Sequence, residues 1–277
     1  MRVAAKPKVQ GSAHKALEVL RQFIGNERDL GVTELCRLTS LDKTSVFRSL
    51  KALELYRLVE QDRVSRRYRL SFGVLELAGA KFRQTPLTML SQPHLARLSQ
   101  ATGETVQMSV LDGHQVLYIS VVESAQPIRV AVGVGTHGPL YCTAAGKLLL
   151  AFAPAAVRNA VLEAPLQRFT VRTLTDAVQL GKELDTIRER GWAVDNEGFA
   201  KHVRVAAAPV RDSAGGVVAA VAVGGPTPRV TTARLRELAQ KAVDAAAGIS
   251  RDLGSSNGSA ASTKRRDSLG SPIRTTT

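Results

Sequence analysis

Residues 42–55, DKTSVFRSLKALEL, bring cations and short hydroxyl side chains together on one face of a predicted helix. Asp42 can cap this helix, because a carboxylate at the N-terminus accepts a backbone N–H and complements the helix dipole. Val46, Leu50 and Leu53 recur at helical spacing and define the buried face. Hydroxyls and cations bond to phosphates and base edges. The pattern predicts a DNA-recognition helix with a polar face of Lys43, Thr44, Ser45, Phe47, Arg48 and Lys51.

A basic amphipathic helix alone is usually a solvated surface helix, so the elements around it decide between the two interpretations. Upstream, apolar residues at helical spacing predict a first helix that ends at Gly25. A second helix is predicted to begin at Thr33, to turn Leu35 and Leu38 inward, and to stop a few residues before Asp42. Two helices joined by so short a turn form a helix-turn-helix. The first helix would bury Ala13, Ala16, Leu17, Leu20, Phe23 and Ile24.

Downstream, residues 58–61 and 67–70 predict two short strands around a polar turn, which together form a wing. Tyr68 and Leu70 alternate inward, so the arginines beside them point outward. This cationic hairpin would lie beside the recognition helix, within reach of the DNA backbone or the minor groove. The predicted DNA-binding residues outside the recognition helix are Thr33, Arg66, Arg67 and Arg69.

The overall charge agrees with an anionic partner. The formal net charge is +14 and the sequence pI is about 10.4. Residues 1–90 hold 17 lysines and arginines against 9 aspartates and glutamates, so much of the excess lies near the predicted helix-turn-helix. A basic surface also suits RNA or anionic lipid, but the helix-turn-helix and the wing favour double-stranded DNA.

A connecting helix is predicted after the wing, over residues 72–83, with Ser71 as its cap. Its broad apolar surface needs a partner, and we expect the same helix of a second subunit, giving a homodimer that reads a palindromic operator. Packing against its own winged helix is the alternative. The apolar residues of this helix are Val74, Leu75, Ala78 and Phe82.

The chain of 277 residues exceeds one winged helix and predicts a second domain. The expected organisation is a disordered basic N-terminus over 1–12, a winged helix-turn-helix over 13–71, a linker helix over 72–85, an effector-binding and oligomerisation domain over 86–253, and a disordered tail over 254–277.

No long apolar run and no signal peptide are found, so we expect a cytoplasmic protein, held at the nucleoid by DNA binding. The two cysteines, Cys36 and Cys142, lack the spacing of a zinc site or a disulfide framework. We therefore expect neither a metal nor a cofactor.

From residue 86 the pattern becomes mixed. Pro93 is predicted to open a helix that Gly103 closes, with Leu95, Leu98 and Ala101 inward. Hairpin-linked strands with helices before, between and after them predict an α+β domain, an antiparallel sheet flanked by helices. The predicted strands are 105–111, 115–122, 128–134, 192–196, 204–210 and 217–223, and the predicted helices are 176–190 and 232–253.

A second chemically interesting segment is GVGTHGPLYCTAAGKLLLAFAP, residues 133–154. Thr143 can cap a helix that begins with Ala144, Ala145 and Gly146, and such an uncrowded N-terminus suits a carboxylate or a phosphate. Close packing of a helix on a sheet explains the small residues equally well. Facing this terminus, a strand end in AVDNEG offers an acceptor, and the next strand offers an apolar wall. These facing residues are Asp195, Val203 and Val205.

Five separated motifs, in this order and spacing, resemble the IclR family of bacterial transcriptional regulators. They are the helix-turn-helix, the wing strand YRL, and the segments PLYCTAAGKLLLAF, IRERGWAVDNEG and AAPVRDSAGGVVAAVAVGGP. The resemblance covers residues 13–250 and implies a dimerising linker helix and a GAF-like domain that binds small organic molecules, commonly carboxylates. Dimers of dimers are common in that family.

By motif, the resemblance assigns Ala144, Ala145, Asp195, Val203 and Val205 to the effector pocket. Glyoxylate- and pyruvate-responsive members have Gly at the place of Ala144 and Cys at that of Val205, so the resemblance does not imply the same ligand. Phe47 stands where a Tyr is frequent.

Two other functions fit parts of the sequence. A thiol enzyme could use Cys142 with His137 or His202 as base and Asp195 as orienting group, although their spacing gives no support. A nonspecific architectural protein would explain the charge alone, and would bind any duplex equally at fixed salt.

Overall fold

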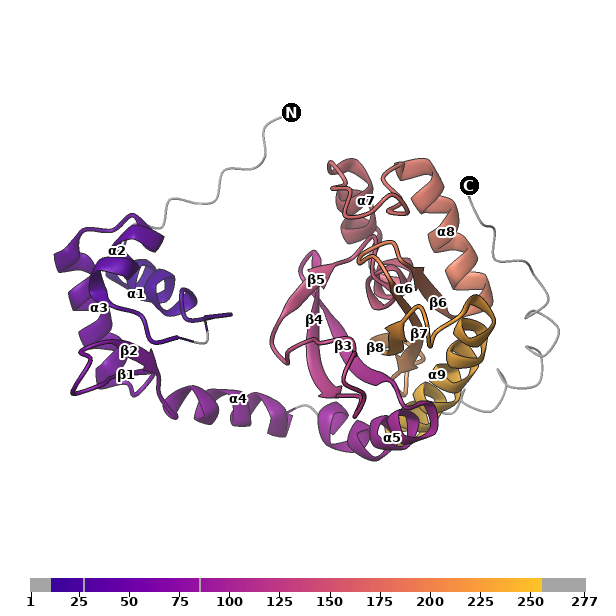
Figure 1. Cartoon of the computed structure of the whole chain (residues 1–277), viewed down its shortest axis with the longest axis horizontal. Coiled ribbons are helices and arrows are strands. Elements are labelled where there is room, and N and C mark those ends of the chain that lie inside the picture. Colours follow the sequence, from indigo (N-terminus) through magenta and orange to yellow (C-terminus); the bar gives the residue numbers. More distant parts are fainter. Residues whose placement is uncertain (1–10, 27, 85, 256–277) are drawn as a thin grey trace. The chain divides into compact units, whose positions relative to one another are not determined.

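The structure, a computed structural model, describes residues 11–26, 28–84 and 86–255. The predicted disordered N-terminus and tail lie almost entirely outside these residues. The chain divides into two compact units, residues 1–85 and 86–277 (Figure 1). No helix of the described part of the chain is both long and apolar enough to cross a membrane.

The first unit is a three-helix domain with a two-stranded wing. Its helices are α1 (Ser12–Arg21), α2 (Val32–Thr39) and α3 (Lys43–Leu55), and β1 (Val59–Gln61) pairs antiparallel with β2 (Tyr68–Leu70). Tyr68 is fully buried, and its backbone also pairs with Leu30, which fastens the wing to the segment before α2. The core, which includes Val46, Leu50 and Leu53 as predicted, also contains Val19, Phe23, Leu30, Leu35, Val59 and Tyr68.

Several apolar residues of this unit point outward, contrary to the prediction. Leu17, Ile24, Leu38 and Leu70 are exposed, and Val19 is buried instead. Helix α1 ends at Arg21 and the chain continues in tight turns, so the helical spacing that we extended to residue 24 no longer applies there. A helix of eight residues such as α2 presents only a narrow face to the core, and Leu35 occupies it.

Helix α4 (Gly73–Gln84) follows the wing and begins close to it. The backbone of Gly73 approaches the carbonyl of Arg57 so closely that a Cβ would collide with it. Phe72, Leu75 and Leu77 are largely exposed in the single chain, whereas Val74 is half-buried. An exposed apolar surface of this kind agrees with a helix that has a partner, and the dimer stays a prediction. The side chain of Phe82 lies outside the described residues.

The second unit is built on a six-stranded antiparallel sheet in the order β5-β4-β3-β8-β7-β6 (Figure 1). Helices α5 and α9 cover one face and share a core with Met108 and Val221. Helices α6, α7 and α8 lie on the other face, with Leu148 and Leu184 inside. The strands are β3 (Thr105–Asp112), β4 (Gln115–Val122), β5 (His137–Pro139), β6 (Ala193–Asn196), β7 (Val203–Arg211) and β8 (Val217–Pro226), and the helices are α5 (Pro86–Thr102), α6 (Ala144–Phe152), α7 (Ala155–Glu163), α8 (Ala177–Arg190) and α9 (Thr232–Asp252).

Three predictions for this unit were wrong. Helix α5 begins at Pro86, because a proline is readily accommodated at the first helical position, and Pro93 lies inside the helix instead of opening it. Ala101 is exposed, although Leu95 and Leu98 are buried. Residues 128–134 form a loop rather than a strand, the edge strand being the short β5, and helix α7 was not predicted.

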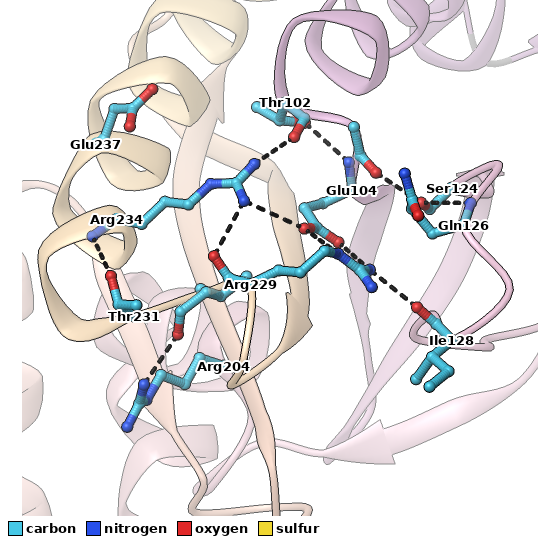
Figure 2. A network of polar contacts seen from close by, with 12 residues as sticks. Thr102, Glu104, Ser124, Gln126, Ile128, Arg204, Arg229, Thr231, Arg234 and Glu237 are labelled. Atoms are coloured by element: carbon cyan, nitrogen blue, oxygen red, sulfur yellow. Dashed lines mark hydrogen bonds and ion pairs between the residues drawn. The ribbon is translucent and has the colours of Figure 1, made fainter.

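A buried carboxylate network fastens the end of α5 to the segment before α9 (Figure 2). Glu104 is 1% exposed and accepts two hydrogen bonds from Arg229, at 2.9 and 2.7 Å, with Arg234 at 3.7 Å. Arg229 also donates to the carbonyl of Ile128, which holds the loop that we had predicted as a strand. A Cβ at Gly225 would collide with this carboxylate, so glycine leaves the room that Glu104 needs.

We predict that Glu104→Gln lowers the free energy of unfolding of the second unit by about 3 kcal/mol, because two guanidinium groups lose their shared counter-charge. Urea unfolding followed by fluorescence of Trp192, the single tryptophan of the chain, measures it. Glu237→Gln is the control, since Glu237 is an exposed partner of Lys241 and its loss should cost under about 0.5 kcal/mol. Equal effects of the two changes would contradict the prediction.

Candidate functional site

The N-terminus of α3 is fixed by Asp42. Its carboxylate accepts hydrogen bonds from the backbone N–H of Ser45 at 2.9 Å and from the Ser45 hydroxyl at 2.6 Å. These bonds lower the pKa of Asp42. Lys15 of α1 donates to the same hydroxyl at 3.0 Å, so Ser45 is half-buried and serves to hold α3 against α1. The predicted cap is present, and it sets the orientation of the residues that follow.

The polar face of α3 is exposed as its spacing predicted. Lys43, Thr44 and Arg48 are exposed, and Arg48 makes no ion pair with any described residue. Lys51 pairs with Glu54 at 2.7 Å and lies 5.7 Å from the centre of the Phe47 ring. Arg48 and Lys43 are therefore the cations of this face that are most available to an anionic partner.

The arginines of the wing differ in how far they are engaged. Arg67 pairs with Glu34 at 2.8 Å and donates to the carbonyl of Asp29, so it joins the wing to α2. Arg69 pairs with Glu60 across the hairpin at 2.7 Å. Arg66 adopts a left-handed backbone at the turn, and its exposed side chain has no ion pair among the described residues. Arg66 is thus the predicted wing cation with the greatest freedom to reach a phosphate.

An open groove of about 520 Å³ lies between the start of α2 and the wing. It brings Thr33 together with Arg66 and Arg67, three of the predicted residues, and adds Arg37, which the sequence analysis missed. The missed signal is the spacing, since Arg37 follows Thr33 by four residues and so shares its helix face. The groove brings three cations of α2 and the wing together with one carboxylate, that of Glu34, which is paired with Arg67.

The second predicted site surrounds the N-terminus of α6. Thr143 caps the helix, accepting the N–H of Gly146 at 3.0 Å, while its hydroxyl donates to the carbonyl of Pro139. Ala144 and Ala145 are buried, and their N–H groups donate to no acceptor among the described residues. A Cβ at position 146 would lie 2.5 Å from the Pro139 carbonyl oxygen, so this tight approach requires glycine. The helix therefore presents two free N–H groups in a protected place.

Asp195 lies at the end of β6 and is 3% exposed. Burial raises its pKa to about 6, and this effect outweighs Lys147 and the backbone N–H groups of Gly198 and Phe199, which favour the charged form. One carboxylate oxygen accepts the Gly198 N–H at 2.6 Å. Thr173 in turn donates to the carbonyl of Gly198, so the neighbouring loop fixes this turn.

The structure places the other predicted pocket residues around the same spot. Val205 pairs in register with Asp195, and both Val205 and Val203 belong to the apolar cluster that contains Ala144 and Ala145. The sequence analysis missed Tyr118 of β4, a 4% exposed member of this cluster. Burial, Asp195 and Cys142 raise the pKa of Tyr118 to about 12. The signal was its alternation with Val116, which gives both residues the same face of the sheet.

The residues of the possible thiol enzyme do not form a catalytic group. Burial, with a smaller contribution from Asp195, raises the pKa of Cys142 to about 12. His137 is paired with Asp112 at 2.9 Å, and the backbone of His202 lies in an exposed left-handed turn. Neither histidine hydrogen-bonds the thiol among the described contacts. No group of three potential metal ligands occurs in the described part of the chain.

Comparison with known proteins matches both units to one family. The IclR helix-turn-helix domain matches residues 12–63, and the domain described as bacterial transcriptional regulator IclR C-terminal matches residues 80–251. The HTH-type transcriptional regulator KdgR of Escherichia coli is 32% identical over 250 residues, 90% of this chain and 95% of that protein.

Solved structures agree with these matches. An IclR transcriptional regulator from Silicibacter sp. TM1040 has a TM-score of 0.77 and 31% identity, covering 89% of this chain and 97% of that one. An IclR homolog from Microbacterium hydrocarbonoxydans, complexed with 4-hydroxybenzoate, has a TM-score of 0.81 at 24% identity, covering 88% of this chain and 99% of that one, and shares its fold.

We predict that Asp195→Asn changes how the stability of the second unit depends on pH. The folded state raises the pKa of Asp195 from 3.8 to about 6. Its contribution to stability is therefore present below a pH of about 4 and is lost as the pH rises through about 6. The free energy of unfolding of the variant should be higher than that of the wild type by about 1–3 kcal/mol near pH 7.5, and the two values should be equal near pH 4. Urea unfolding followed by Trp192 fluorescence measures the free energy of unfolding at both pH values. Asp244→Asn, at an exposed position, is the control. Identical pH profiles for Asp195→Asn and the wild type would contradict the raised pKa of Asp195.

We also predict that only one of the two thiols reacts quickly with a disulfide reagent in the native protein at pH 8. Cys36 is half-buried, whereas the raised pKa of Cys142 keeps its thiol neutral. Spectrophotometric thiol titration should give the second equivalent only after unfolding, and Cys36→Ser should abolish the fast phase. A fast phase that persists in Cys36→Ser would show a reactive Cys142.

Proposed function

This chain belongs to the IclR family of bacterial transcriptional regulators, and from this we propose that its first unit reads a palindromic operator while its second unit binds a small organic acid that controls the reading. The protein is a regulator rather than an enzyme. The observation that carries the effector proposal is the pair of buried N–H groups at Ala144 and Ala145 beside Asp195. We propose that the protein is cytoplasmic and is held at the nucleoid by DNA binding.

The proposed operator contacts follow from which cations are free. Arg48 and Lys43 at the exposed start of α3 would meet base edges and phosphates in the major groove, as the second helix of a helix-turn-helix does. Arg66 and Arg37, in the groove beside the wing, would meet phosphates on the flanking backbone. Arg67 and Arg69 would contribute less, since each already has a carboxylate partner.

The proposed effector is a carboxylate. A carboxylate at the start of α6 would accept the N–H groups of Ala144 and Ala145 and would be stabilised by the helix dipole. Val203 and Val205 would contact its apolar part. Asp195 would accept a hydrogen bond from a hydroxyl or amine of the ligand when charged, or donate to it when protonated. The structure of a homolog with bound 4-hydroxybenzoate shows that one protein of this fold holds an aromatic carboxylate.

Control requires that the effector bind two states of the oligomer unequally. We propose that α4, whose Phe72, Leu75 and Leu77 are exposed in the single chain, pairs with its copy in a homodimer or a dimer of dimers. A change in the second unit would then alter the spacing of two winged helices and so the affinity for the two half-sites. A ligand that bound both states equally would leave operator affinity unchanged.

We predict that Arg48→Ala weakens operator binding by about 1–3 kcal/mol, or roughly 5- to 150-fold, if Arg48 makes a bidentate base contact. The measurement is selection of fragmented genomic DNA by the purified protein, followed by titration of the enriched sites by fluorescence anisotropy. Arg251→Ala removes the same charge from an exposed position of the second unit, and should change affinity little.

The selection also tests the alternative function. A regulator enriches a few sites that share an inverted repeat, and these sites are lost in Arg48→Ala. An architectural protein recovers all fragments evenly, with an affinity that depends only on salt. Uniform recovery would therefore overturn the operator proposal.

A further inference from the structure

Three polar side chains lie on the face of the sheet that α6 covers. Gln107 and Ser109 alternate with Val106 and Met108 along β3, and the latter two belong to the core under α5 and α9. In register, Gln107 pairs with Ala222 and Ser109 with Ala220, both of which belong to the core under α6. Gln107 and Ser109 therefore point to the side of Ala144, Ala145 and Asp195.

Tyr118 extends this polar row. It is the register partner of Ser109 on β4 and belongs to the same core cluster as Ala144 and Ala145. Its hydroxyl approaches Gly138, where a Cβ would lie 3.0 Å from it. Burial raises the pKa of Tyr118 to about 12, with smaller contributions from the charges of Asp195 and Cys142.

None of these three groups is satisfied within the described chain. The Oε1 of Gln107 and the Oγ of Ser109 are buried without a hydrogen-bond partner, and the residues are 6% and 0% exposed. The hydroxyl of Tyr118 is not one of these fully buried atoms, and no hydrogen bond of it occurs among the described contacts. Buried polar groups are nearly always hydrogen-bonded, so the two buried unpartnered groups of Gln107 and Ser109 on one face point to a partner from outside the chain.

The neighbouring strand β8 places only small side chains beside these groups. Beside Gln107 and Ser109, β8 contributes only the methyl groups of Ala222 and Ala220. Two residues after Ala222, β8 has Gly224, which pairs with Val205. On this face, β8 therefore places no bulky side chain between the polar row and Val205. The row and the α6 N-terminus therefore lie on the same face of the sheet, because the register partners of Gln107 and Ser109 belong to the core cluster that contains Ala144 and Ala145.

We infer that the effector is a polyhydroxy carboxylate, whose hydroxyl groups are read by Gln107, Ser109 and Tyr118 while its carboxylate binds at the N-terminus of α6. This inference rests on the proposed function, which supplies the carboxylate end. Hydroxyl groups suit the row because each can both donate and accept, which matches an amide oxygen and two hydroxyls. A site of this kind discriminates strongly against a ligand that lacks the hydroxyls, because its own polar groups then stay unpaired.

The test is calorimetric titration of the full-length protein with acids matched in carbon number. D-gluconate and D-galactonate are compared with hexanoate, and L-threonate with butanoate. At least one polyhydroxy acid should bind about tenfold or more tightly than its unsubstituted counterpart. Sorbitol, which has the hydroxyls without the carboxylate, should bind no more tightly than hexanoate.

Three variants locate the preference. Ser109→Ala and Tyr118→Phe should each reduce the affinity for the preferred acid about tenfold and leave hexanoate binding unchanged. Gln107→Leu should act in the same direction. Tyr68→Phe is the matched control, since it removes another buried, unpartnered phenol hydroxyl but lies in the first unit. The melting temperatures of the variants without ligand show that they are folded.

The outcomes separate the two proposals. If hexanoate binds as tightly as every polyhydroxy acid, or if Ser109→Ala and Tyr118→Phe have no effect on the preferred acid, the hydroxyl-reading inference is overturned and the carboxylate site stands. If sorbitol binds as tightly as gluconate, the α6 terminus is not an anion site and both proposals fail. If ordered water is the only partner of Gln107, Ser109 and Tyr118, we expect hexanoate to bind as tightly as the polyhydroxy acids.

Discussion

The structure of the second unit depends on how two buried carboxylates, Glu104 and Asp195, are stabilised. A carboxylate removed from water is costly unless cations or hydrogen-bond donors replace its hydration. Glu104 meets this requirement fully, because Arg229 binds both of its oxygens and Arg234 lies nearby. Asp195 meets it only in part, through Lys147 and the backbone N–H groups of Gly198 and Phe199, so burial raises its pKa to about 6. The satisfied carboxylate belongs to the framework, and the partly satisfied one lies in the proposed ligand site.

A chain of hydrogen bonds connects the two. Arg234 donates to the carbonyl of Arg229, and Arg204 donates to the carbonyl of the next residue, Val230. Arg204 also binds Asn196 and Glu197, which follow Asp195 directly (Figure 2 shows the part from Glu104 to Arg204). The turn that holds Asp195 is therefore fixed to the segment that begins α9. A ligand that moved this turn would have to act against these bonds, which gives the unit a physical route from the proposed ligand site to the framework.

The first unit follows a different principle, in which a small apolar core and one helix cap fix the orientation of exposed cations. Val46, Leu50 and Leu53 anchor α3, and Asp42 with Ser45 determines where it starts. Some cations near the wing and α3 are paired with a neighbouring carboxylate, and others have no ion pair among the described residues. The paired ones are Lys51, Arg67 and Arg69. This distribution, rather than net charge, selects Arg48 and Arg66 as the candidates for contact with DNA.

The sequence by itself determined the elements whose signals are local. Helices α3, α6 and α8 carry their own caps, Asp42, Thr143 and Asp176, and β4 has alternating residues behind a two-residue turn, so these were predicted within a residue or two. The family and the ends of the proposed carboxylate site followed from motifs. Only the tertiary structure shows that residues 128–134 form a loop, which Arg229 contacts at the Ile128 carbonyl from 101 residues away. Only the tertiary structure likewise shows that Glu104 is paired across 125 residues. It also brought Gln107, Ser109 and Tyr118 to the face of Asp195, since which face of a strand meets a ligand depends on sheet register and on the helix that covers it, and neither is encoded in neighbouring residues.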